Sequence, residues 1–146
     1  MKLSSRELLE PLEGAKASGV LCLVHAENDD MIEYLRGVAD DRGDAAPKFH
    51  ATTRPIPAER EATHRAIALA EVIDVPIVIV HVSNRDAMEE IEAGRRRGSK
   101  VFGETCPQYL VLTKDDLDLV GFDGAKYVCS PPPRDTDRQD ACWQGL

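Results

Sequence analysis

The feature that most constrains the fold is a pair of short apolar segments that each end in a histidine. Val20–Val24 is followed directly by His25, and Pro76–Val80 is followed directly by His81. A short continuous apolar run bounded by polar residues is typical of a strand that is buried on both faces. Both segments are therefore predicted to be buried strands, each presenting a histidine at its C-terminal end.

Helical spacing of apolar residues predicts helices before, between and after these strands. The clearest is 58–72, whose alanines recur at helical intervals. Two more strands are expected, at Lys100–Glu104 and Ala125–Cys129, and a proline-containing loop at 45–57. Pro11 indicates a kink in the first helix, or a later start. The expected helix starts are Ser4 or Ser5, Asp29 or Asp30, Ser83, Thr113 and Asp135, and the expected ends are Gly19, Gly43 and Gly98.

Apolar strands that alternate with helices predict an α/β fold whose parallel sheet is covered on both faces. Two architectures fit this order: an open doubly wound sheet, or part of a (β/α)8 (TIM) barrel. A complete barrel takes about 250 residues. Residues 1–146 are therefore expected to be a single segment supplying about half of one.

Charge and cysteine usage exclude several classes of function. A net charge of −8 disfavours binding to nucleic acid or to an anionic membrane. No apolar segment approaches a membrane span of about 20 residues, and the N-terminus does not resemble a signal peptide. The four cysteines form no Cys-x-x-Cys pair, which indicates reduced thiols and a cytoplasmic location. No glycine-rich phosphate loop or Gly-x-Ser-x-Gly elbow is present, so a nucleotide enzyme is disfavoured.

Polar residues at the C-terminal ends of the strands are the candidates for chemistry, because function gathers there in parallel α/β folds. Imidazole nitrogens suit zinc, which acidifies a bound water to a nucleophilic hydroxide. A strand-end histidine is also commonly a hydrogen-bonded structural residue, so both interpretations stay open for the pair. Glu27 is either a partner that fixes a histidine tautomer or a carboxylate of the next helix turn. The candidate residues are His25, Glu27, Asn28, His81, Glu104 and Ser130.

Five phrases together resemble the dihydropyrimidinase/D-hydantoinase family of cyclic amidohydrolases. They occur in the family's order and at similar separations, and the resemblance runs from about residue 4 to residue 146. The phrases are Val24–Asn28, Phe49–Pro55, Ile79–Ser83, Gly103–Leu110 and Gly124–Pro132.

The resemblance implies a (β/α)8 barrel with two divalent metals, usually zinc, bridged by a carboxylated lysine and a hydroxide. It implies that His25 and His81, which lie 56 residues apart, are metal ligands on the fifth and sixth barrel strands. It also implies that Ser130 contacts the ring amide of the substrate. Glu27, Asn28 and Glu104 are the candidates to support the ligands from just outside the metal. The implied reaction is hydroxide attack on a ring carbonyl and cleavage of the C–N bond to give an N-carbamoyl amino acid.

Several parts of the family's site have no counterpart in this sequence. They are a His-x-His pair on the first strand, the bridging lysine, a catalytic tyrosine and an aspartate on the last strand. Lys2 is not the bridging lysine, because the family's spacing puts that residue before residue 1. The chain is therefore expected to be an internal segment of a longer, homo-oligomeric protein, and to be inactive when isolated.

Two alternatives to a dihydropyrimidinase or hydantoinase remain. One is a sister enzyme of the allantoinase or dihydroorotase type. The other is a non-catalytic, dihydropyrimidinase-like scaffold that acts by oligomerisation. Retention of His25 and His81 argues against the scaffold, because such relatives tend to lose metal-binding histidines.

Overall fold

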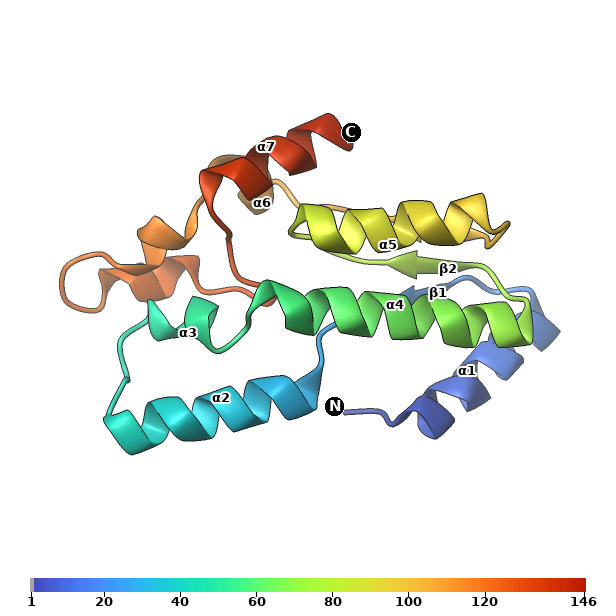
Figure 1. Ribbon diagram of the computed structural model, residues 1–146, viewed down its shortest axis with the longest axis horizontal. Helices are drawn as coiled ribbons and strands as arrows, with labels where there is room; N and C mark the ends of the chain where they lie inside the picture. Colours follow the sequence, from blue (N-terminus) through green and yellow to red (C-terminus); the bar gives the residue numbers. More distant parts are fainter. Residues whose placement is uncertain (1) are drawn as a thin grey trace.

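The computed structural model describes residues 2–146, in which short parallel strands alternate with helices (Figure 1). The elements are α1 (Ser5–Ser18), β1 (Cys22–Val24), α2 (Asp29–Arg42), α3 (Phe49–Thr52), α4 (Ile56–Ile73), β2 (Ile77–Ile79), α5 (Arg85–Arg96), β3 (Val101–Gly103), α6 (Gln108–Val111), the 3-10 helices η1 (Lys114–Leu117) and η2 (Asp123–Tyr127), and α7 (Thr136–Gln144).

The three strands form one parallel sheet in the order β1-β2-β3. Cys22 pairs with Ile77, and Ile77 pairs in turn with Val101. The parallel α/β prediction is confirmed for this part of the chain. Each strand is shorter than predicted: β1 lacks Val20 and Leu21 at its start, β2 lacks Val80 at its end, and β3 lacks one residue at each end.

The expected fourth strand at 125–129 is wrong. Residues 123–127 form η2, which packs so closely on η1 that a Cβ at Gly124 would lie 2.2 Å from the Leu117 carbonyl oxygen. Lys126 pairs with Asp123 three residues earlier at 2.7 Å, and this spacing fits a helical turn. The apolar residues of the segment suggested a strand, but local packing favours the turn.

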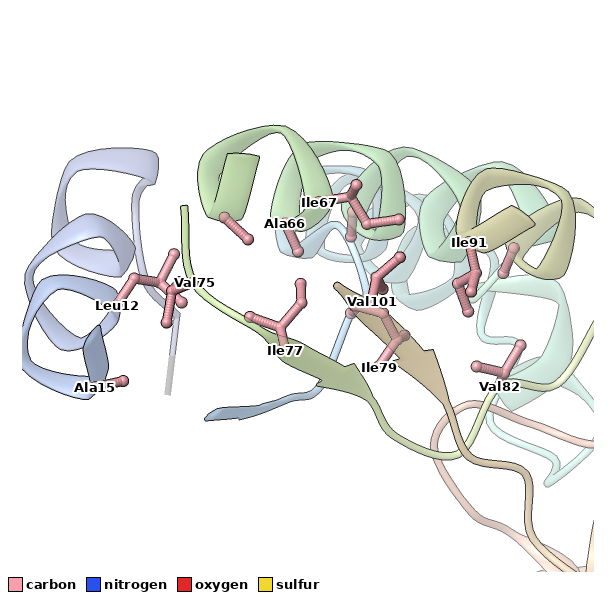
Figure 2. Close-up of a cluster of buried hydrophobic side chains, with 14 residues drawn as sticks. Leu12, Ala15, Ala66, Ile67, Val75, Ile77, Ile79, Val82, Ile91 and Val101 are labelled. Carbon is pink, nitrogen blue, oxygen red and sulfur yellow. The ribbon is translucent and has the colours of Figure 1, made fainter. Parts of the chain in front are cut away.

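Helices α4 and α5 cover one face of the sheet and enclose the main core with it. Figure 2 shows Ile67 of α4 and Ile91 of α5 facing Ile77, Ile79 and Val101 of the strands. Leu12 and Ala15 of α1 extend this core beside Val75, at one end of the sheet (Figure 2). These side chains are almost fully buried, so burial of apolar area holds this layer together.

The opposite face of the sheet is uncovered within residues 2–146, so the prediction of two covered faces is wrong for this part. Leu23, Val78 and Phe102 align across the three strands on that face. Leu23 is 67% exposed and Phe102 50% exposed. An apolar row of this kind is typical of a surface that another element covers.

The ends of the first two long helices agree with their sequence signals. The Ser4 hydroxyl accepts from the Glu7 amide to cap α1, and Gly19 ends it at φ +70°. Pro11 lies inside α1, so the later start is wrong; the buried Leu12 and Ala15 offset the lost backbone hydrogen bond. Gly43 ends α2 in the same left-handed conformation as Gly19.

One predicted helix cap moves by one residue, and two short helices were not predicted. The helix α2 begins at Asp29 as predicted, with Asn28 as its cap, whereas Asn84 caps α5 instead of Ser83. In both cases the asparagine side chain reaches the third amide of the helix. The short α3 lies within the expected loop at 45–57, and α6 follows Pro107. Among residues 2–146, no helix has the length and apolar character needed to cross a membrane.

Candidate functional site

The site begins where β1 and β2 end side by side. Val24 pairs with Ile79 in the parallel ladder, so the residues that follow emerge at the same edge of the sheet. His25 Nδ1 lies 2.8 Å from His81 Nε2, and the two ring centroids are 4.7 Å apart. The histidines that the sequence places 56 residues apart therefore converge through one ring nitrogen each.

His81 has an unusual backbone conformation, which the end of β3 supports. Its φ is +46°, a left-handed value that is uncommon for a residue other than glycine. Glu104 accepts the His81 amide through Oε2 at 3.0 Å and the Val82 amide through its carbonyl oxygen at 2.7 Å. The Thr105 hydroxyl donates to the Val82 carbonyl at 2.8 Å. Such strain persists where the surroundings enforce it, and it clusters at functional sites.

Glu27 fixes the orientation of His25. Its Oε2 lies 3.2 Å from His25 Nε2, and its side chain is only 4% exposed. A carboxylate beside one ring nitrogen holds a proton there and leaves the other nitrogen with a free lone pair. Glu27 therefore directs the lone pair of His25 Nδ1 toward His81.

Two buried polar atoms of this cluster have no hydrogen-bond partner. They are Glu27 Oε1 and His81 Nδ1. Buried polar atoms are rarely left unpaired, so each such atom requires an explanation. Neither is a ring nitrogen through which the two histidines converge. Burial, and secondarily the neighbouring His25, lower the pKa of His81, which favours the neutral imidazole that binds metals.

Ser130 reaches the same cleft from the other end of the chain. A cleft of about 770 Å³ is lined in part by His25, Glu27, Arg54 and Ser130. The Ser130 hydroxyl lies 3.3 Å from His50 Nε2, which also contacts the Cys129 carbonyl oxygen at 2.8 Å. His50, which does not follow a predicted strand, therefore anchors the segment that carries Ser130.

Asn28 is committed to local structure. Its Oδ1 accepts from the Met31 amide at 3.1 Å as the cap of α2, and its amide nitrogen donates to Glu61 at 2.5 Å. Lys2 pairs with Asp29 at 3.3 Å and also with Asp30. Neither side chain is among the groups that contact the two histidines.

The two converging imidazoles fit a divalent ion that prefers nitrogen ligands, such as zinc. The lone pair that Glu27 leaves on His25 Nδ1 agrees with that fit. Within residues 2–146, no group of three or more histidine, cysteine, aspartate or glutamate side chains is arranged to hold a metal. This part of the chain thus offers two nitrogen ligands and their supports.

Sequence reasoning missed a buried ion pair behind the site, between Glu59 and Arg134. Glu59 lies in the first turn of α4, where a carboxylate usually faces solvent and favours the helix dipole. No local signal links Glu59 to a residue 75 positions later.

No protein-family model matches the chain. It is 47% identical over 139 residues to a D-hydantoinase from Rhizobium radiobacter and 47% identical over 139 residues to one from Geobacillus stearothermophilus. Each match covers 95% of this chain and 30% of the relative. A solved dihydropyrimidinase from Brevibacillus agri superimposes with a TM-score of 0.94 at 48% identity, covering 96% of this chain and 30% of that one. The chain thus spans about a third of the length of the relatives it matches.

Proposed function

The chain belongs to the D-hydantoinase and dihydropyrimidinase family, and we propose that it supplies part of a metal site that hydrolyses cyclic amide C–N bonds. His25 and His81 are the proposed metal ligands. The observation that carries the proposal is the convergence of His25 Nδ1 and His81 Nε2 at 2.8 Å. The proposed substrates are dihydropyrimidine or hydantoin rings, which open to N-carbamoyl amino acids.

The proposed metal is zinc, with two divalent ions in the complete site. When bound, such an ion polarises the ring carbonyl and makes water acidic enough to attack it near neutral pH. In this proposal His25 and His81 bind the ion, and the carboxylates beside them orient the two imidazoles. His25 presents Nδ1 because Glu27 occupies its other nitrogen, and Glu104 holds the backbone that presents His81.

Ser130 is the proposed contact for the ring amide of the substrate. It lines the same cleft as His25 and Glu27, and His50 fixes the backbone just before it. Arg54 lies at the same cleft and donates to His50 Nδ1 at 3.2 Å. A planar amide bound in this cleft would lie near the Ser130 hydroxyl and His25, which line it together.

Zinc titration of the 146-residue protein tests the ligand assignment. Replacing either His25 or His81 with alanine should weaken zinc binding by at least about tenfold, because each removes one of two nitrogen ligands. His64→Ala is the control, because His64 pairs with Glu90 on the helices away from the sheet edge. Equal zinc affinity in all three variants and the unmodified chain would contradict the proposal.

Hydrolysis of the ring is measured separately from zinc binding. We expect the isolated chain with added zinc to leave dihydrouracil and hydantoin intact, because the family's remaining ligands have no counterpart in this sequence. Detection of the N-carbamoyl product by chromatography would show that the two histidines and their supports suffice.

The relatives' names favour hydantoin or dihydropyrimidine rings over the substrates of allantoinase or dihydroorotase. A non-catalytic scaffold is the competing class. It should purify without stoichiometric metal, and alanine at His25 or His81 should leave its assembly unchanged. The supported tautomer of His25 and the strained backbone of His81 argue for a working ligand pair.

A further inference from the structure

A buried ion pair lies behind the two histidines. Arg134 Nη2 lies 2.9 Å from Glu59 Oε2, and the two side chains are 6% and 2% exposed. Removing both charges from water is costly, and well-packed apolar residues commonly replace such a pair without loss of stability. The pair therefore calls for a role besides stability.

The carboxylate of Glu59 is bonded to the loop that follows β2. Oε1 accepts the Ser83 amide at 2.8 Å, while Oε2 accepts the Ser83 hydroxyl at 2.5 Å and the Asn84 amide group at 2.7 Å. Ser83 is two residues beyond His81. Glu59 thus fixes the loop that carries the left-handed histidine.

The guanidinium of Arg134 joins that loop to the segment that carries Ser130. Its Nε donates to the Ser83 hydroxyl at 2.9 Å, and its Nη1 donates to the Arg54 carbonyl at 2.5 Å. Arg134 lies four residues after Ser130, and Arg54 lines the cleft. Tyr109 adds a second anchor by donating to the Pro131 carbonyl at 2.7 Å.

We propose that Glu59 and Arg134 are positioning residues that lock the loop carrying His81 to the segment carrying Ser130. They set the distance between the metal-ligating side and the substrate-binding side of the site. The inference rests on the proposed function, because it assigns those two sides. Neither residue lines the cleft, so each acts through the backbone that it holds in place.

The alternative is that the pair only stabilises the fold, and a double variant separates the two roles. Glu59→Gln/Arg134→Met removes both charges and leaves an amide oxygen to accept from the loop. It avoids the uncompensated buried charge that either single change would leave. The control double, Glu71→Gln/Arg97→Met, makes the same changes at an exposed pair at the other end of α4.

The readouts are the unfolding midpoint, the imidazole ¹H–¹⁵N resonances and the zinc dissociation constant. His81 reports on its own loop, and His50 reports on the Ser130 segment through its bond to the Cys129 carbonyl. We expect the double variant to unfold close to the control, with both resonances shifted. We also expect its zinc dissociation constant to rise by about tenfold, as when a supporting group of a metal ligand is lost.

Arg134→Lys is the second variant, in case the double variant does not fold. A lysine can pair with Glu59 but cannot also reach the Ser83 hydroxyl and the Arg54 carbonyl. The same shifts of His81 and His50 are expected from it. Unchanged resonances and unchanged zinc affinity in folded protein would overturn the proposal.

Failure of the proposed metal site gives a different experimental result from failure of the positioning role. If the unmodified chain binds no zinc, the metal assignment fails, while the His81 and His50 resonances of the variants still decide whether the pair positions the two segments.

Discussion

His50 shows how one half-buried side chain can make stability depend on pH. Burial, and secondarily the nearby Arg54 guanidinium, lower the pKa of His50 below its usual value of 6.5. Its Nε2 contacts the Cys129 carbonyl, and its Nδ1 accepts from Arg54. A proton on Nδ1 would replace that hydrogen bond with repulsion between like charges.

The sign of the effect follows from proton binding. Because the folded pKa is lowered, the unfolded chain binds a proton first as pH falls below about 6.5, and stability decreases from there toward the folded pKa. Urea unfolding of the unmodified chain and of His50→Gln between pH 7.5 and 5 should show a smaller pH dependence in the variant. Parallel curves would contradict this assignment.

The sequence identified the chemistry-bearing residues better than the residues that support them. His25 and His81 stand out because each ends an apolar run, and the parallel ladder brings them together. The Glu59–Arg134 pair could not be predicted, since charged residues in a helix or after prolines are ordinarily exposed. Burial of charge depends on which segments meet in three dimensions, and a single sequence does not display that.

At the level of elements, Gly94 shows how closely α5 packs against α4 and β3. A Cβ at this position would lie 2.9 Å from Ile67 Cγ2 and 3.2 Å from Val101 Cγ1. Gly94→Ala should destabilise the protein by about 1–3 kcal/mol, because overpacking outweighs the gain in helix propensity. Chemical denaturation measures the change.

Gly37 in α2 is the matched control for Gly94. It is also inside a helix, but nothing lies within 4 Å of its Cβ position. Gly37→Ala should stabilise the protein by about 0.5–1 kcal/mol through helix propensity alone. A stabilising effect at both positions would show that Ile67 and Val101 leave room for a methyl group at Gly94.

The strand predicted at 125–129 was wrong for a physical reason. The segment 125–129 has strand-like residues, but it lies next to η1 and turns instead, as Gly124 permits. The parallel strands were predicted correctly because their apolar runs face the core on at least one side. Periodicity predicts which residues are buried, whereas a short apolar run alone does not say against what it packs.

At the scale of the whole molecule, the uncovered face of the sheet determines whether the chain self-associates in solution. Leu23 and Phe102 are exposed on that face, and β1 and β3 are edges of the sheet among the described residues. Exposed apolar rows and open edges promote association. We expect the 146-residue chain to self-associate at micromolar concentration.

Leu23→Glu/Phe102→Glu should shift sedimentation velocity toward the monomer, because two charges then lie on the apolar row. Tyr34→Glu on α2 is the control, because Tyr34 is 73% exposed and belongs to a different element. If the control reduces association as much as the double variant, the sheet face is not the contact surface.

The central claim is that His25 and His81 bind the same divalent ion. Zinc-edge X-ray absorption of the chain loaded with one equivalent of zinc tests it most directly, because imidazole scattering counts the histidine ligands. We predict two imidazoles at about 2.0 Å in the unmodified chain and one in His81→Ala. A spectrum with no imidazole, or one that the His81→Ala substitution leaves unchanged, would contradict the claim.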